Sequence, residues 1–347
     1  MQSLLAVYVH HLDPFAIRFT ETFGIRWYGL AYVAGFMAAF FLIRWFVRIG
    51  ASELKESQVG DFITLCAVGG TMLGGRLGYM LLYNFDELVS NPASFFDILG
   101  GGMSSHGGIA GITIVAWFYA RHTKTSWAGH GDNLVTVAPL GVFFGRLANF
   151  INGELYGRPT DAKLAMKFPD ELTELQATPS GLEWKFPTAQ LRELAANAAE
   201  SAPGLVEKID AAVVRALASG YDAHMAVVGL VQETSRENPV FRAALGEILT
   251  PRHPSQLYEA LVEGLFLFLI LLAIRVKWKN AYHGVITGIF FILYAVGRIA
   301  VENFREPDAE QIAGMTRGQF YSIFMIFIGI AFLAYGFVRK RRNGMPV

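Results

Sequence analysis

Long apolar runs dominate this chain and restrict it to folds that a lipid bilayer can accommodate. A helix rises about 1.5 Å per residue, so a run near twenty apolar residues can cross the hydrocarbon layer. With 53% hydrophobic and 17% charged residues, the composition agrees with a helical membrane protein. We predict an all-α integral membrane protein, a bundle of about seven transmembrane helices. The predicted spans are residues 27–46, 59–83, 107–120, 133–151, 256–274, 284–301 and 320–338.

The third run and the segment after the fourth run depart from this pattern. The third run is short and rich in glycine, which fits a tilted helix or a segment that re-enters the membrane. Residues 159–250 are rich in Ala, Glu, Lys and Asp, and they predict a small helical domain with helices near 188–201 and 205–218. The predicted domains are therefore 1–158 with spans one to four, the helical insert 159–250, and 251–347 with spans five to seven and a tail.

Basic residues collect after predicted spans one, three, five and seven. They are Arg44, Arg48, Lys55, Arg121, Lys124, Arg275, Lys277, Lys279 and residues 339–342. Because Lys and Arg accumulate on the cytoplasmic side of membranes, the C-terminus is predicted to be cytoplasmic. The N-terminus and the insert then face outward. Residues 1–14 lack the basic start and small-residue cleavage site of a signal peptide, so we expect no cleavage there.

Charge and cysteine content exclude several functions. The formal net charge is zero, which disfavours nucleic acid as a partner, since phosphate binding needs a basic excess. Cys66 is the single cysteine of the sequence, so neither an intramolecular disulfide nor a cysteine-based metal site is expected. It lies in an apolar run, where we interpret it as a small buried hydrophobic residue.

Glycine has two interpretations in this chain. Pairs four residues apart allow helix backbones to approach closely in lipid, and we expect this role for most of them. These pairs are Gly70 and Gly74, Gly74 and Gly78, Gly107 and Gly111, and Gly141 and Gly145. The glycines around His106 instead predict a flexible or tightly turned backbone that presents this histidine at the membrane surface. They are Gly100, Gly101, Gly102, Gly107 and Gly108.

Polar residues interrupt the predicted spans near their outer ends. A charge within the bilayer costs roughly 3 kcal/mol, so such groups are expected to have a function or a partner. Arg146 and Asn149 share a face of span four. Tyr294, Arg298 and Glu302 form a stripe on span six. Gln256, Glu259 and Glu263 share a face of span five.

The predicted topology places these groups, together with His106, in one outward-facing pocket. Arg146 and Arg298 would offer forked donors suited to a phosphate, and a lipid headgroup is the natural ligand at this depth. In the alternative interpretation, the two arginines form structural ion pairs with Glu154, Glu302 or Glu259.

The run GRLANFINGELYGR at residues 145–158 resembles the signature of the prolipoprotein diacylglyceryl transferases, G-R-x-x-N-F-I-N-G-E-x-x-G-R. Further segments resemble that family in the same order, namely 27–30, 74–79, 101–108, 252–259 and 298–308. The resemblance covers nearly all of the membrane part but not the insert, which looks longer than is typical.

This resemblance implies an activity and its partners. Members transfer the diacylglyceryl group of phosphatidylglycerol to the thiol of the lipobox cysteine in prolipoprotein signal peptides. A thioether forms and glycerol phosphate is released. The expected location is the bacterial inner membrane, as a multi-pass protein in contact with the lipid bilayer. No cofactor or metal is implied, and the attacking sulfur belongs to the substrate, so Cys66 need not take part.

The chemistry assigns roles to the polar residues. The thiol has an ordinary pKa of about 8.5 and must lose its proton, and His106 is the best-placed base. Arg146 and Arg298 suit the departing phosphate. Alternatively, Arg146 stabilises the thiolate, and His106 caps a helix or bonds to a carbonyl. With the roles that the resemblance implies, the predicted substrate-binding residues are Tyr28, Arg146, Asn149, Asn152, Glu154, Gly157, Tyr294, Glu302, Gln256 and Glu259.

Two other functions agree with part of this residue pattern. Buried arginines and glycine-rich helices also occur in transporters of anionic substrates, although this chain shows no internal repeat. Another phospholipid headgroup transferase of the metal-dependent kind would need clustered aspartates, whereas Asp61, Asp132 and Asp308 lie singly.

Overall fold

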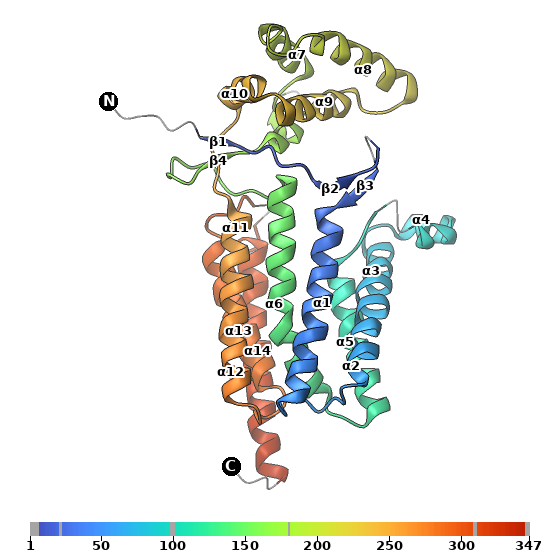
Figure 1. The fold of residues 1–347 in the computed structure, drawn as a ribbon, viewed down its shortest axis with the longest axis vertical. Helices are drawn as coiled ribbons and strands as arrows, with labels where there is room; N and C mark the ends of the chain where they lie inside the picture. The colour runs from blue at the N-terminus through green and yellow to red at the C-terminus, as the bar shows by residue number, and fades with distance from the viewer. Residues whose placement is uncertain (1–6, 21–22, 98–100, 180, 308–310, 344–347) are drawn as a thin grey trace. The chain divides into compact units, whose positions relative to one another are not determined.

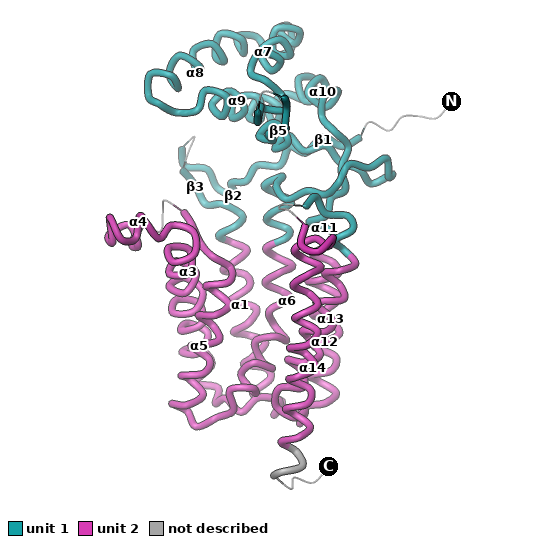
Figure 2. The backbone as a smooth tube through the Cα atoms, turned by 180° about the vertical axis from the view of Figure 1, so that it is seen from behind, with its two compact units in different colours: residues 1–29, 146–258, 301–308 teal, residues 30–145, 259–300, 309–347 magenta. Residues whose placement is uncertain are grey.

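The structure is a computed structural model that describes residues 7–20, 23–97, 101–179, 181–307 and 311–343 (Figure 1). Gly100 and Asp308, which belong to segments singled out above, lie outside the described residues. The chain divides into two compact units, coloured separately in Figure 2. Unit 1 contains residues 1–29, 146–258 and 301–308, and unit 2 contains residues 30–145, 259–300 and 309–347.

The described residues are mostly helical, and five of their helices are long and apolar enough to cross a membrane. Two of these are composite, since each has a wider π-helical segment at or near its middle. The five are α1 (Trp27–Arg48), α2 to α3 (Gln58–Leu82), α6 (Trp127–Asn152), α11 to α12 (Ser255–Lys277) and α14 (Arg317–Asn343, apolar to Arg339). A helical membrane protein is thereby confirmed.

The composite helices divide as follows. The first consists of α2 (Gln58–Leu65), η1 (Cys66–Gly74) and α3 (Gly75–Leu82). The second consists of α11 (Ser255–Glu259), η4 (Ala260–Phe266) and α12 (Leu267–Lys277). The remaining helices of the membrane part are α4 (Phe85–Ser90), the 3-10 turn η2 (Pro92–Phe96), α5 (Ser105–Thr123) and α13 (Val285–Val301).

Helix α5 corresponds to the short third run of the sequence. It is unbroken from Ser105 to Thr123, longer than the expected 107–120, and shows no interruption of a re-entrant kind. The Ser104 hydroxyl caps it by accepting from the Gly107 amide at 3.2 Å. Gly101 and Gly102 before it have φ near +80°, a left-handed conformation that glycine adopts without strain.

Glycines join α5 to the helix α2 to α3 within unit 2. A Cβ atom on Gly78 would lie 2.5 Å from the Cα of Gly107, and one on Gly74 would lie 3.0 Å from the Cα of Gly111. The close-packing prediction is therefore confirmed for these glycines. It is wrong for Gly145, whose added Cβ would meet no described heavy atom within 4 Å.

Apolar side chains form the core of unit 2. Ile43, Phe46, Val59 and Phe62 are fully buried in one cluster. Cys66 belongs to the same cluster at 2% exposure, which confirms its interpretation as a buried hydrophobic residue. A second cluster around Leu271 joins α12 to α13.

The insert in unit 1 is built mainly from four helices. They are α7 (Thr188–Asn197), α8 (Leu205–Ser219), α9 (Ala223–Glu237) and α10 (Pro239–Ile248). Their shared core includes Leu191, Ile209, Val231, Phe241 and Leu245, each with no exposed surface. Both expected helices are present, but α7 ends at Asn197 instead of continuing to residue 201.

Short strands, which the sequence does not predict, complete unit 1. β1 (Tyr8–Val9) pairs in parallel with β4 (Met166–Lys167), so the N-terminal segment is joined to the insert. Antiparallel pairs are formed by β2 (Phe15–Arg18) with β3 (Gly24–Arg26), and by β5 (Leu175–Thr178) with β6 (Gly181–Trp184). The 3-10 turn η3 (Pro169–Thr173) separates β4 from β5. Strands of two to four residues are too short for an alternating pattern to be recognised.

Candidate functional site

The signature run 145–158 spans the end of α6 and the loop that follows it. The helix ends at Asn152, and Gly153 then has a φ of +76°. Leu155 also has a positive φ, of +57°, which is uncommon for a residue with a side chain. This sharp turn returns Glu154 to the helix end, where its amide donates to the Asn149 carbonyl at 3.1 Å.

Five predicted site residues form one hydrogen-bonded group in unit 1, which we call the Asn149 cluster: Arg146, Asn149, Asn152, Glu154 and Gln256. The Asn149 side chain donates to Glu154 Oε1 at 2.7 Å, and Asn152 donates to the same oxygen at 3.2 Å. Arg146 Nη1 donates to Asn149 Oδ1 at 3.3 Å. Gln256 Nε2 donates to the Glu154 carbonyl at 2.7 Å. The structure thus brings these five predicted residues together, and their joint role stays a prediction.

Buried polar atoms of the cluster retain hydrogen-bonding capacity. Asn149 is 4% exposed and Gln256 is fully buried. The oxygens Asn152 Oδ1 and Gln256 Oε1 have no hydrogen-bond partner among the described residues. Buried acceptors of this kind are uncommon, and they are expected to meet a donor from water or a bound molecule.

Gly157 packs against two other segments of unit 1. Its amide donates to the His253 carbonyl at 2.8 Å, and the next amide, of Arg158, donates to the Phe304 carbonyl at 2.9 Å. A Cβ atom on Gly157 would overlap the Phe304 carbonyl oxygen and lie 2.9 Å from that of His253. The position therefore requires glycine for a structural reason. Near this contact, Glu302 is 3% exposed and lies 3.9 Å from Arg305 Nε.

A buried ion network supports the same loop, and the sequence reasoning assigned it no role. Arg252 Nη2 lies 3.1 Å from both Glu171 Oε1 and Glu174 Oε2, and Nη1 lies 3.0 Å from Glu306 Oε2. Burial opposes the charge of Arg252, but Glu174 and Glu171 raise its pKa above the ordinary value. The only sequence signal was the place of Arg252 at the start of the segment 252–259.

Asp170 places a further carboxyl group near Glu154. Burial, together with the negative charges of Glu154 and Glu174, raises its pKa to about 6. The group around Glu154 is thus rich in carboxylates.

In unit 2, Arg298 lies beside two buried carboxylates. Its Nη1 lies 3.1 Å from Glu259 Oε2 and 3.5 Å from Glu263 Oε1, and both glutamates are fully buried. The ion pair with Glu259 is the structural alternative that the sequence left open. Glu263 was expected on this face but was not among the predicted site residues. It lies in the π-helical segment η4, a backbone form that is frequent at functional sites.

The other predicted residues occupy different environments. Tyr294 is half-buried in unit 2, with its ring centre 5.7 Å from that of Phe290. His106 is the second residue of α5 and is exposed, so it belongs to the first helical turn instead of the glycine turn before it. Tyr28, in unit 1, is the second residue of α1 and is 36% exposed.

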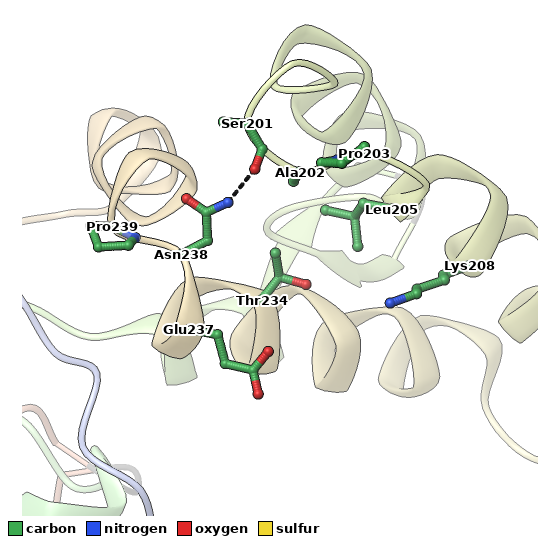
Figure 3. Close-up of a pocket in the computed structure, with 9 residues that line it drawn as sticks. All are labelled: Ser201, Ala202, Pro203, Leu205, Lys208, Thr234, Glu237, Asn238 and Pro239. Carbon is green, nitrogen blue, oxygen red and sulfur yellow. Dashed lines mark hydrogen bonds between the residues drawn. The ribbon is translucent and has the colours of Figure 1, made fainter.

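A cavity of about 290 Å³ lies within the insert (Figure 3). The α7–α8 connection, α8, the end of α9 and the start of α10 line it, and Asn238 bridges it by donating to the Ser201 carbonyl. None of the predicted site residues lines this cavity.

Comparisons with known proteins give one consistent result. Residues 14–335 match the family model described as prolipoprotein diacylglyceryl transferase. A protein of Bdellovibrio bacteriovorus, named phosphatidylglycerol–prolipoprotein diacylglyceryl transferase, is 38% identical over 93% of this chain and 92% of its own length. Proteins with the same name from Idiomarina loihiensis and Coxiella burnetii are 35% and 31% identical, over 92% and 97% of this chain and 91% and 100% of theirs.

Proposed function

We propose a residue-level account of catalysis on the premise that this chain belongs to the prolipoprotein diacylglyceryl transferase family. The protein is a bacterial membrane transferase that moves the diacylglyceryl group of phosphatidylglycerol to a prolipoprotein, the first step of lipoprotein maturation.

In the proposed reaction, the lipobox cysteine sulfur attacks the glycerol carbon that carries the phosphate. A carbon–sulfur bond forms, the carbon–oxygen bond to phosphate breaks, and glycerol phosphate leaves. The thiol proton must be taken up by a base, and negative charge increases on the departing phosphate. Two protein functions are therefore needed, a proton acceptor and a fixed cationic donor.

Arg146 is the proposed phosphate ligand. The observation that carries this assignment is the Asn149 cluster, in which Arg146 donates to Asn149 and Asn149 donates to Glu154. An orienting partner fixes the guanidinium before substrate arrives, so less entropy is lost on binding. Asn149, Asn152, Glu154, Gln256 and Gly157 would then shape the headgroup site.

Arg298 is the proposed second cation. Glu259 and Glu263 hold its guanidinium, which supports a role that depends on a fixed orientation. Two carboxylates beside one guanidinium also lower the local positive charge. We therefore assign Arg298 to the negative charge that develops on the departing phosphate in the transition state. Arg146 is assigned to the phosphate of the bound lipid before the reaction. Tyr28, Tyr294 and Glu302 would complete the wall of the site.

His106 is the proposed proton acceptor. It is exposed at the start of α5 and accessible to a substrate thiol. The alternative assignment, in which Arg146 stabilises the thiolate directly, predicts that a His106→Gln variant keeps most of its turnover near neutral pH, where a thiol without such help is mostly protonated.

We propose a seven-span arrangement in the inner membrane. Besides the five long helices, α13 is apolar over 17 residues, and α5 packs by its glycines along the helix Gln58–Leu82. Basic residues follow α1, α5 and α12, which supports a cytoplasmic location for these ends and for the C-terminus, with the N-terminus outside. The membrane domain then comprises 1–158 and 251–347, and 159–250 is an extracytoplasmic domain.

The proposed reaction is tested with the purified protein, phosphatidylglycerol and a lipobox peptide. We expect one glycerol phosphate to be released for each peptide that gains a diacylglyceryl mass. A matched peptide with serine in place of the lipobox cysteine should give neither product. Release of glycerol phosphate with the serine peptide at the same rate would contradict attack by sulfur.

A further inference from the structure

A second polar hollow lies in unit 2, at the opposite end of α5 from His106. It has a volume of about 970 Å³ and is lined by the segments after α1, α5 and α12 and by the last turns of α14. Lys124, which lines it, follows the C-terminal end of α5, whereas His106 lies at the N-terminal end. At 1.5 Å per residue these positions are about 27 Å apart along the helix. The hollow is therefore distinct from the site that contains His106.

The lining of this hollow is strongly basic. Lys124, Arg275, Lys279 and Arg339 line it, against the single carboxylate of Glu53. Glu53 is already engaged, because its Oε2 accepts from the Ser126 amide at 2.8 Å and its Oε1 lies 3.5 Å from His283 Nε2. The positive charge of the hollow thus exceeds what its own carboxylate can balance.

Arg275 is a built-in part of this lining. It is 3% exposed, and its Nη2 donates to Asn133 Oδ1 at 2.6 Å. Asn133 in turn donates to Ser52, which also lines the hollow. Asp132, a buried carboxylate whose charge acts on Arg275 without forming an ion pair with it, accepts hydrogen bonds from Gly284 and Thr287. Arg275 is therefore held in place by a neutral amide, and among the described residues it forms no ion pair.

The two lysines are also without a carboxylate partner in the part of the chain that the structure describes. Lys124 and Lys279 are exposed, and neither forms an ion pair there. A buried guanidinium held by neutral groups, with two mobile ammonium groups at the rim, is an arrangement that suits a phosphate. Basic hollows between membrane helices commonly take anionic headgroups.

We propose that this hollow is a second binding site of the protein, for an anionic phosphate group. The phosphate is carried by a phospholipid headgroup of the adjacent leaflet or is free in solution, and the volume accommodates either. The site is separate from diacylglyceryl transfer, so the proposal stands independently of the roles assigned to Arg146, Arg298 and His106.

The test compares two double variants of the delipidated, detergent-purified protein by calorimetric titration. Lys124→Gln with Lys279→Gln removes two charges from the hollow. Lys55→Gln with Lys277→Gln removes two charges from the same end of the bundle, at residues that do not line it. The probes are dioctanoyl-phosphatidylserine, dioctanoyl-phosphatidylcholine and inorganic phosphate. Both variants should release glycerol phosphate at the normal rate, which verifies the fold.

For the Lys124→Gln, Lys279→Gln variant, we expect the affinity for dioctanoyl-phosphatidylserine to fall by about ten-fold or more. For the Lys55→Gln, Lys277→Gln control, the affinity should stay within about two-fold of that of the wild type. Competition by inorganic phosphate would support a free phosphate as the occupant. Lipid binding without such competition would support a headgroup. Equal weakening in the two variants, equal affinity for the phosphatidylcholine and phosphatidylserine probes, or no binding of any probe would overturn the proposal.

Discussion

The hydrogen bond from Asn149 to Glu154 provides a sharp test of the Asn149 cluster. In an Asn149→Asp variant, an oxygen replaces the donor that now lies 2.7 Å from Glu154 Oε1. The substitution keeps the shape of the side chain and leaves Oδ1 able to accept from Arg146. The change therefore replaces one donor with an acceptor and adds one negative charge, so its effect reports on the contact between positions 149 and 154.

The cost follows from the contact itself. Losing a hydrogen bond to a charged group removes about 1.5–3 kcal/mol. Two carboxylates at this separation repel each other by about 6 kcal/mol at an effective dielectric constant near 20, and the site avoids this by separating them or binding a proton. Asn149 is 4% exposed, so water screens little of this repulsion. A net penalty of about 3–4 kcal/mol corresponds to a loss in turnover of about 100- to 1,000-fold at pH near 7.5.

The pH dependence identifies the cause. Adjacent carboxylates raise the pKa of one member of the pair, so a shared proton is bound again as the pH falls. That proton restores a hydrogen bond between positions 149 and 154. The ratio of variant to wild-type turnover should therefore rise as the pH is lowered from about 8 to about 5.5. Dividing by wild-type turnover at each pH removes the effect of ionisation of the substrate thiol, which is the same for both proteins.

A second substitution provides the rescue. Adding Glu154→Gln to Asn149→Asp exchanges donor and acceptor, and we expect about ten-fold or more of the lost turnover to return. Glycerol phosphate release with a lipobox peptide measures all three proteins. Near-normal turnover of folded Asn149→Asp protein, or a ratio that does not change with pH, would refute the reasoning.

Three further predictions concern stability and the cysteine. Burial lowers the pKa of His10 to about 4, below its unfolded value of about 6.5. The free energy of unfolding should therefore fall by up to about 3 kcal/mol as the pH drops from about 6.5 to about 4. Thermal unfolding of a His10→Gln variant should lack this pH-dependent loss. Gly78→Val should destabilise by about 1–3 kcal/mol or more because its Cβ meets Gly107, whereas Gly145→Ala should be tolerated, as melting temperatures will show. Cys66→Ala should retain turnover, and a folded but inactive variant would reverse its interpretation as a bystander.

The membrane helices could be predicted because their signals are local. Apolar runs gave all the long helices to within a few residues at most ends, and the spacing of Gly74 and Gly78 predicted the contact with α5. The short pairing of β1 with β4 could not be predicted, since it joins two dipeptides that are about 160 residues apart in sequence.

The residues of the candidate site could be predicted from the sequence, but the contacts between them could not. Helical spacing placed Arg146 beside Asn149, and the structure adds that Glu154 returns to them through a left-handed turn at Gly153. The contact of Arg252 with Glu171 and Glu174 joins a segment near α11 to the insert, and such long-range ion pairs leave no periodic signal in a sequence. Long-range pairing is set by tertiary packing.

The role of Arg146 is the central claim, and turnover by Arg146→Gln tests it most directly. The assay is simultaneous release of glycerol phosphate and gain of diacylglyceryl mass by a lipobox peptide, with the exposed Arg192→Gln variant as a control for loss of one arginine. Removing a fixed cationic donor from a developing charge should lower turnover by about 100-fold or more while the protein still inserts and melts normally. Turnover within about two-fold of the wild type, in a protein with a normal melting temperature, would contradict the assignment of Arg146 to the phosphate.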